Sequence, residues 1–179
     1  KRLYIYKGNT PIVEAPTVEI IDMAAESGQP LPAIKSVDTP VKFKGRIIGG
    51  CLDTLITLCG TRFDKVKELT EKYKEDGIIW FIESCDLSML QIRRALFQFK
   101  NAGWFNHASG FIFGRQCHFN ETEIGVSAYN AVTSVLGYFD KYIVMDADIG
   151  HLPPTIPIVS GAIADVTVDD NISIQYIYE

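Results

Sequence analysis

The sequence predicts an α/β domain whose mostly parallel sheet is flanked by helices and finished by antiparallel strands. Three observations support this class. From Gly45 onward, short apolar runs without alternation, which are typical of strands buried on both faces, occur between amphipathic segments. Strands that alternate with helices in this way form parallel sheets. The last apolar segment alternates instead, with Ile172, Ile174 and Tyr176 at every second position, which predicts a half-buried edge strand.

The first 44 residues differ in character from residues 45–179. They contain five of the eight prolines and little sustained periodicity, so we interpret residues 1–44 as an interdomain linker or arm that packs on something else. Within it, residues 17–28 could form a short helix that Gly28 ends. The chain starts without a Met, which suggests a cut in a longer parent, although a processed or trimmed start would look the same.

The predicted elements of residues 45–84 are a strand and Gly-Gly turn followed by a helix, a second helix, and a strand buried on both faces. The second helix spans residues 64–77, is polar outside, and ends at Gly77. The buried strand is "GIIWFIES", residues 77–84. The expected inner face of the first helix comprises Leu52, Leu55, Ile56 and Cys59. The expected inner stripe of the second comprises Val66, Leu69 and Tyr73.

The remaining elements continue the alternation. Residues 88–103 predict an amphipathic helix in which Leu90, Arg94 and Phe97 fall on neighbouring turns. A strand, a helix and a strand are then expected at residues 108–115, 128–139 and 141–147. Two or three strands close the chain, with a hairpin turn at "VDDN", residues 168–171.

Composition excludes several functional classes. The net charge is −5 and no basic stripe stands out, which argues against a nucleic-acid partner. The longest apolar runs are too short to span a bilayer, so no membrane segment is expected. The four cysteines form no CxxC pair, so neither a zinc knuckle nor a redox motif is indicated, and we expect reduced thiols and no cofactor.

Two residues are candidates for general acid-base chemistry. Glu83 closes a buried strand, where a carboxylate is costly unless it is paired, and sites are built at such strand ends. His151 lies in a Gly-His-Leu-Pro-Pro turn, and Pro153 and Pro154 stiffen the loop by fixing φ. A rigid loop suits a general base, because it holds the imidazole in one orientation. The alternatives are a half-exposed strand-end glutamate and an ordinary surface histidine.

A metal site is another reading of the same loop. Asp146, Asp148 and His151 form the pattern D-x-D-x-x-H. Neither HExxH nor paired CxxC accompanies it, and the two aspartates alternate sides of a strand end, so no metal is expected. The further ligands would be Cys85, Asp86, Cys117 and His118.

The chain lacks an evident nucleophile. No G-x-S-x-G elbow and no glycine-rich phosphate loop is present. Ser84 and Cys85 adjoin Glu83, but nothing in the sequence marks either of them as activated.

Four segments together resemble, in order and spacing, the C-terminal domain of the LD-carboxypeptidase family, which includes muramoyl-tetrapeptide carboxypeptidases and microcin C self-immunity peptidases. The resemblance covers about residues 44–179 and implies a swivelling β/β/α-like fold. The segments are "GRIIGGCLDTLITLCGT", "GIIWFIESCD", "IRRALFQFKNAGWFNHASGFIFGR" and "IVMDADIGHLPPTIPIVSGAIADV".

This resemblance implies a serine peptidase whose Ser-His-Glu triad is divided between two domains. The nucleophilic serine would lie in an N-terminal domain missing from this chain, while Glu83 and His151 match the family's glutamate and histidine. His151 would take the serine proton and return it to the leaving amine, and Glu83 would orient the imidazole. We therefore expect the two side chains within hydrogen-bond reach. Family substrates carry a free carboxylate after an L,D or related bond, as in peptidoglycan tetrapeptides that lose D-alanine.

Two positions depart from the family pattern. Cys51 replaces the asparagine of the usual Gly-Gly-Asn-Leu turn, and Ser84 replaces an aspartate. Both changes affect the expected substrate pocket. The residues assigned to that pocket are Gly49, Gly50, Cys51, Ser84 and Asp148.

The expected partners are the missing N-terminal domain and a peptide substrate, in a bacterial cytoplasm, with neither nucleic acid nor membrane. A homodimer could form through the surface that the missing domain normally covers. We expect residues 1–179 alone to be inactive. The alternatives are a catalytically dead binding module, a peptidase of microcin-type peptide-nucleotide conjugates, and a metal-dependent hydrolase.

Overall fold

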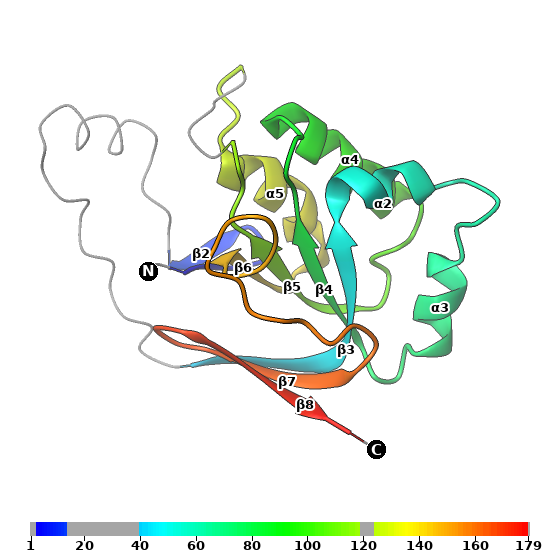
Figure 1. Cartoon of the computed structure of the whole chain (residues 1–179), viewed down its shortest axis with the longest axis vertical. Coiled ribbons are helices and arrows are strands. Elements are labelled where there is room, and N and C mark those ends of the chain that lie inside the picture. Colours follow the sequence, from blue (N-terminus) through cyan, green and yellow to red (C-terminus); the bar gives the residue numbers. More distant parts are fainter. Residues whose placement is uncertain (1–2, 14–39, 119–123, 179) are drawn as a thin grey trace, which may run out of the picture.

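A computed structural model describes residues 3–13, 40–118 and 124–178 (Figure 1). Its eight strands form one sheet in the order β2-β1-β6-β5-β4-β3-β7-β8. The strands are β1 (Tyr4–Lys7), β2 (Thr10–Val13), β3 (Val41–Cys51), β4 (Ile78–Glu83), β5 (Ala108–Gly114), β6 (Tyr142–Ala147), β7 (Ile163–Val168) and β8 (Ile172–Ile177). The helices are α2 (Leu52–Leu58), α3 (Val66–Lys72), α4 (Met89–Asn101), α5 (Ala128–Leu136) and the 3-10 helix η1 (Gly137–Phe139).

The centre of the sheet is parallel. Strands β3, β4, β5 and β6 pair in parallel, whereas β7, β8, β1 and β2 add antiparallel pairs at the two edges. The predicted fold class is therefore confirmed, including the C-terminal antiparallel strands. Strand β4 is buried along almost its whole length, which explains its lack of alternation, and Ile172, Ile174 and Tyr176 are half-buried on the edge strand as predicted.

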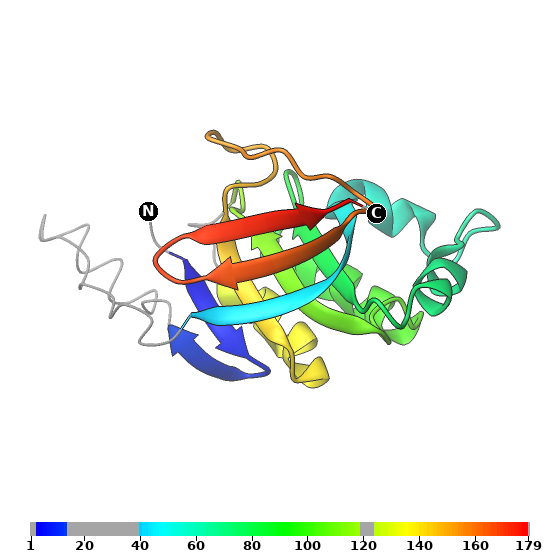
Figure 2. The ribbon, with the colours of Figure 1, turned by 90° about the horizontal axis from the view of Figure 1, so that it is seen from below.

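Strand β3 bends the sheet onto itself. Residues 41–46 pair with β7, whereas residues 46–51 pair with β4. The first half carries Phe43 over Gly110 of β5, where an added Cβ would lie 2.4 Å from the ring. A side chain at position 110 would therefore block this curl. Figure 2 shows β7, β8 and the start of β3 side by side along one side of the molecule.

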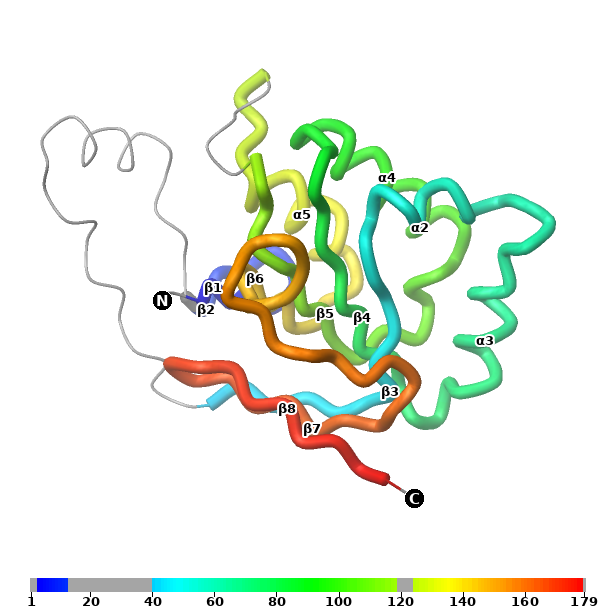
Figure 3. Tube along the Cα trace, viewed as in Figure 1, coloured from blue at the N-terminus to red at the C-terminus, as the bar shows by residue number. Residues whose placement is uncertain are grey.

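Helices α4 and α5 pack against each other behind the parallel strands, while the segment between β6 and β7 passes in front of them (Figure 3). The buried face of α4 is not the Leu90, Arg94 and Phe97 face of the sequence prediction, since Phe97 is 55% exposed. The residues that are buried instead recur every three or four positions. None of them is charged, so burying them costs less free energy. They are Met89, Ile92, Ala95, Leu96 and Phe99.

The inner face of α3 also differs from the sequence prediction. Leu69 is exposed, and Thr70 is buried in its place, with its hydroxyl donating to the carbonyl of Lys67 at 3.2 Å. This local hydrogen bond lets a polar side chain occupy the inner face. No helix within the described ranges is long and apolar enough to cross a membrane.

The N-terminal segment contributes to the sheet. Strands β1 and β2 form a hairpin, β1 pairs with β6, and Ile5 is fully buried. This part of the predicted arm therefore packs on the domain itself, and the domain's first long strand begins at Val41 instead of at residue 45. The predicted helix at residues 17–28 lies outside the described residues.

Candidate active site

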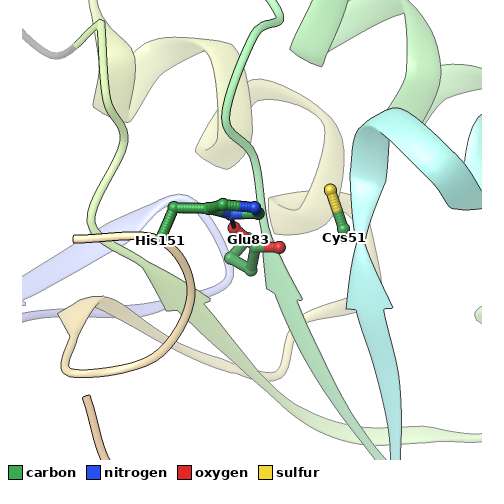
Figure 4. A group of neighbouring side chains, drawn as sticks. All are labelled: Cys51, Glu83 and His151. Atoms are coloured by element: carbon green, nitrogen blue, oxygen red, sulfur yellow. Dashed lines mark hydrogen bonds and ion pairs between the residues drawn. The ribbon is translucent and has the colours of Figure 1, made fainter. Parts of the chain in front are cut away.

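Glu83 and His151 meet at the carboxyl ends of the parallel strands. Glu83 is the last residue of β4, and His151 lies in the segment that follows β6. The Nδ1 atom of His151 lies 2.7 Å from Oε2 of Glu83 (Figure 4). The contact expected from the sequence is therefore present.

The two side chains differ in exposure, and this difference suits a base and its orienting partner. The Glu83 side chain is 9% exposed, whereas that of His151 is 50% exposed. The hydrogen bond and charge of Glu83 raise the pKa of His151, and Asp53 and Asp86 raise it further. An ionised carboxylate can only accept, so Nδ1 carries the shared hydrogen and neutral His151 keeps its lone pair on Nε2.

Two glycines pack against the Glu83 side chain. A Cβ added at Gly150 would lie 2.7 Å from Oε2 of Glu83, and one added at Gly114 would lie 2.8 Å from its Cβ. The end of β5 and the loop after β6 therefore lie directly against Glu83, which is buried. Neither glycine stands out in the sequence, although Gly150 precedes His151 and Gly114 lies near the end of the strand expected at residues 108–115.

Gly150→Ala is expected to destabilise the protein and displace Glu83. The φ of Gly150 is +95°, a left-handed conformation in which alanine is less stable than glycine by about 1–2 kcal/mol. The clash with Glu83 should add about 1–3 kcal/mol. Denaturant unfolding measures the sum. Gly161→Ala is the matched control, because Gly161 has a φ of +90° and nothing near its added Cβ. Equal losses in the two variants would contradict the close packing at Gly150.

Arg115 holds the loop that carries His151. Its guanidinium donates to the carbonyls of Leu152, Pro153 and Pro154 at 2.6, 3.2 and 2.6 Å. It also forms an ion pair with Asp148 at 3.1 Å. Asp148 therefore structures the loop through Arg115, and its assignment to a substrate pocket stays a prediction.

Asp53 holds the segment that follows Glu83. Its carboxylate accepts from the Ser84 hydroxyl at 2.9 Å and from the backbone N–H of Cys85 and Asp86 at 3.1 and 2.8 Å. Burial acts to raise the pKa of Asp53, but these hydrogen bonds outweigh it and lower the pKa. Ser84 is buried and bonded to Asp53, so its predicted pocket role has no support from its contacts.

The end of β3 places a thiol beside Glu83 and His151, which together form the dyad. A Cβ at Gly49 would lie 1.7 Å from the carbonyl oxygen of Phe81, so only glycine fits there, whereas Gly50 borders open space. Cys51 follows, and its Sγ lies within 4.8 Å of ligand atoms of both Glu83 and His151. Figure 4 shows the three side chains converging from β3, β4 and the loop after β6.

The D-x-D-x-x-H pattern does not assemble a metal site. Asp146 accepts a hydrogen bond from Tyr129 at 2.5 Å, and Asp148 pairs with Arg115. Within the described ranges, the group of three or more potential metal ligands is Cys51, Glu83 and His151. The metal-hydrolase alternative built on the two aspartates is therefore not supported.

Known proteins share the fold of this chain. The family model of the LD-carboxypeptidase C-terminal domain matches residues 44–166. A muramoyltetrapeptide carboxypeptidase from Oxalobacter formigenes is similar with 18% identity and a TM-score of 0.58, covering 77% of this chain and 48% of that chain. The wild-type apo microcin C7 self immunity protein MccF is 23% identical with a TM-score of 0.59, covering 99% and 52%.

A third structure, an MccF-like protein from Bacillus anthracis str. Ames, is 22% identical with a TM-score of 0.57 and covers 83% of this chain and 46% of that chain. These likenesses establish a shared fold. The chain spans about half the length of the solved structures it matches. Comparison with curated proteins gave no match.

Proposed function

The chain belongs to the LD-carboxypeptidase family, whose C-terminal domain it contains, and on this basis we propose that it supplies the histidine and glutamate of a Ser-His-Glu peptidase site. The observation that carries the proposal is the 2.7 Å contact between His151 and the buried Glu83 at the sheet's carboxyl edge. The serine would come from a second domain, which is the proposed partner of this one.

The geometry fits the roles of a base and its orienting carboxylate. Nε2 of His151 would take the proton of the serine hydroxyl as the oxygen attacks the scissile carbonyl. The same nitrogen would then protonate the leaving amine. Glu83 would hold Nδ1–H and stabilise the imidazolium, in keeping with the raised pKa of His151.

The described residues contain no evident nucleophile for this base. In these ranges His151 has no hydroxyl hydrogen-bonded to it, and Ser84 is bonded to Asp53. Cys51 is the nearest candidate, but burial and the neighbouring Glu83 raise the pKa of its thiol. A protonated thiol is a poor nucleophile, so this environment favours a serine supplied from outside the described residues.

The proposed substrate is a peptide with a free carboxylate beyond an L,D or related bond, such as a peptidoglycan tetrapeptide that loses D-alanine. The family assignment supports this class. Peptide-nucleotide conjugates are the second candidate, because MccF structures cover 97–99% of this chain and one contains glutamyl sulfamoyl guanosine. Assaying both substrates with the same preparation separates the two classes.

The decisive experiment compares residues 1–179 alone with the same chain joined to its serine-bearing domain. We expect no D-alanine release from a tetrapeptide by the isolated chain and release by the joined protein. Release by the isolated chain that Cys51→Ser abolishes would reassign the nucleophile to the thiol. An inactive joined protein on both substrates would instead identify a binding module that kept the fold.

A further inference from the structure

Cys51 gives this site a donor that a Ser-His-Glu mechanism does not require. Its Sγ, a carboxylate oxygen of Glu83 and a ring nitrogen of His151 all lie within 4.8 Å of one another. Thiolate, imidazole and carboxylate are the side chains that bind Zn²⁺, and three protein ligands leave one position for water. We propose that Cys51, Glu83 and His151 form a binding site for a zinc ion.

The cluster needs a modest contraction to bind zinc. Zn–S bonds of about 2.3 Å and Zn–N or Zn–O bonds of about 2.0–2.2 Å place tetrahedral ligand atoms roughly 3.6 Å apart. The separations are at most 4.8 Å, so none must shrink by more than about 1 Å. His151 is half-exposed and Cys51 is partly buried, so both side chains have room to turn, whereas Gly114 and Gly150 fix Glu83.

The hydrogen bond between Glu83 and His151 holds the imidazole beside the other two donors. With Nδ1 bonded to Oε2, the free lone pair lies on Nε2, and Figure 4 shows the second oxygen of Glu83 directed toward Cys51. Glu83 cannot keep this bond to Nδ1 and also ligate a metal held by Nε2 of the same ring, so zinc binding by all three side chains would replace the hydrogen bond with bonds to the metal.

The charge around the cluster favours a cation. Asp53 Oδ2 lies 3.5 Å from the thiol of Cys51, and Glu83 adds a second carboxylate. Among the described residues, the nearby Arg115 is engaged by Asp148 and by the carbonyls of residues 152–154. A thiophilic divalent ion would offset this negative charge, whereas Mg²⁺ and Ca²⁺ prefer sites made only of oxygen.

Bound zinc would occupy the imidazole nitrogen that the proposed peptidase mechanism uses. Zinc would then inhibit the enzyme, a consequence that rests on the proposed function. Binding itself does not, because it is measurable on this chain without any activity.

The test is a titration of metal-free residues 1–179 with Zn²⁺ by calorimetry, with Cd²⁺ absorption reporting the metal–sulfur bond. We expect one zinc per chain, bound at least about 10-fold more weakly by Cys51→Ser and by His151→Ala. Cys59→Ser is the control for a cysteine outside the cluster. Cys85→Ser tests whether the metal binds instead to the thiols of Cys85 and Cys117, whose Sγ atoms lie 3.9 Å apart. Circular dichroism confirms that each variant is folded.

Zinc binding that Cys51→Ser leaves unchanged would overturn the site. A loss that follows Cys85→Ser instead would also overturn it and would move the metal to Cys85 and Cys117. Zinc bound through Cys51 in a protein that proves inactive on peptides would uphold the metal site and refute the peptidase proposal, so the two failures are distinct.

Discussion

His151→Ala is expected to lower the kcat of the proposed peptidase by about 10⁴- to 10⁶-fold, the range found when single members of a catalytic triad are removed. Without the imidazole, the serine hydroxyl has no base and the leaving amine has no acid. Glu83 would also lose its 2.7 Å partner in a buried position. The assay is D-alanine release by the joined protein at saturating tetrapeptide.

The matched control is His107→Ala. His107 also lies 2.7 Å from a carboxylate, that of Glu71, but this pair is on the surface and joins α3 to the residue before β5. Its loss should leave kcat within about 2-fold, as for most surface substitutions. A folded His151→Ala variant that retains more than about 1% of kcat would contradict a role as general base.

Both members of the dyad could be predicted because each has a local signature. Glu83 ends an uninterrupted apolar strand, and His151 is followed by two prolines, so the sequence alone singles out a buried carboxylate and a stiffened imidazole. That parallel strands end on one edge then makes their meeting expected. The resemblance to the family added the role of each residue, which spacing does not give.

The surroundings of the dyad could not be predicted, because they depend on contacts between distant segments. Gly114 and Gly150 matter only because the end of β5 and the loop after β6 lie against Glu83. Asp53 was unremarkable in a helix, yet it accepts three hydrogen bonds from residues 84–86. The hairpin of β1 and β2 was missed for a similar reason, since its partner β6 lies far along the chain.

Glu83→Gln is expected to lower kcat by about 10³- to 10⁴-fold, by analogy with the loss of the orienting carboxylate in other triads. The amide is nearly isosteric and should keep the packing against Gly150. Its NH₂ group, however, can donate to Nδ1 of His151, which places the ring proton on Nε2. The imidazole would then face the serine with a donor instead of a lone pair. Rates of the joined protein measure the loss, with Glu71→Gln as the control on the surface pair.

The pKa of His151 in the Glu83→Gln variant shows whether Glu83 orients the imidazole or only packs against it. In the wild type Glu83 raises this pKa, so the charged pair adds stability that is complete below about pH 6.5 and is lost as pH rises through the folded value. Glu83→Gln should lower the pKa measured by NMR titration in metal-free buffer and flatten the pH dependence of unfolding. An unchanged pKa together with a large loss of kcat would assign Glu83 a packing role, because a carboxylate that orients and charges the imidazole must affect both.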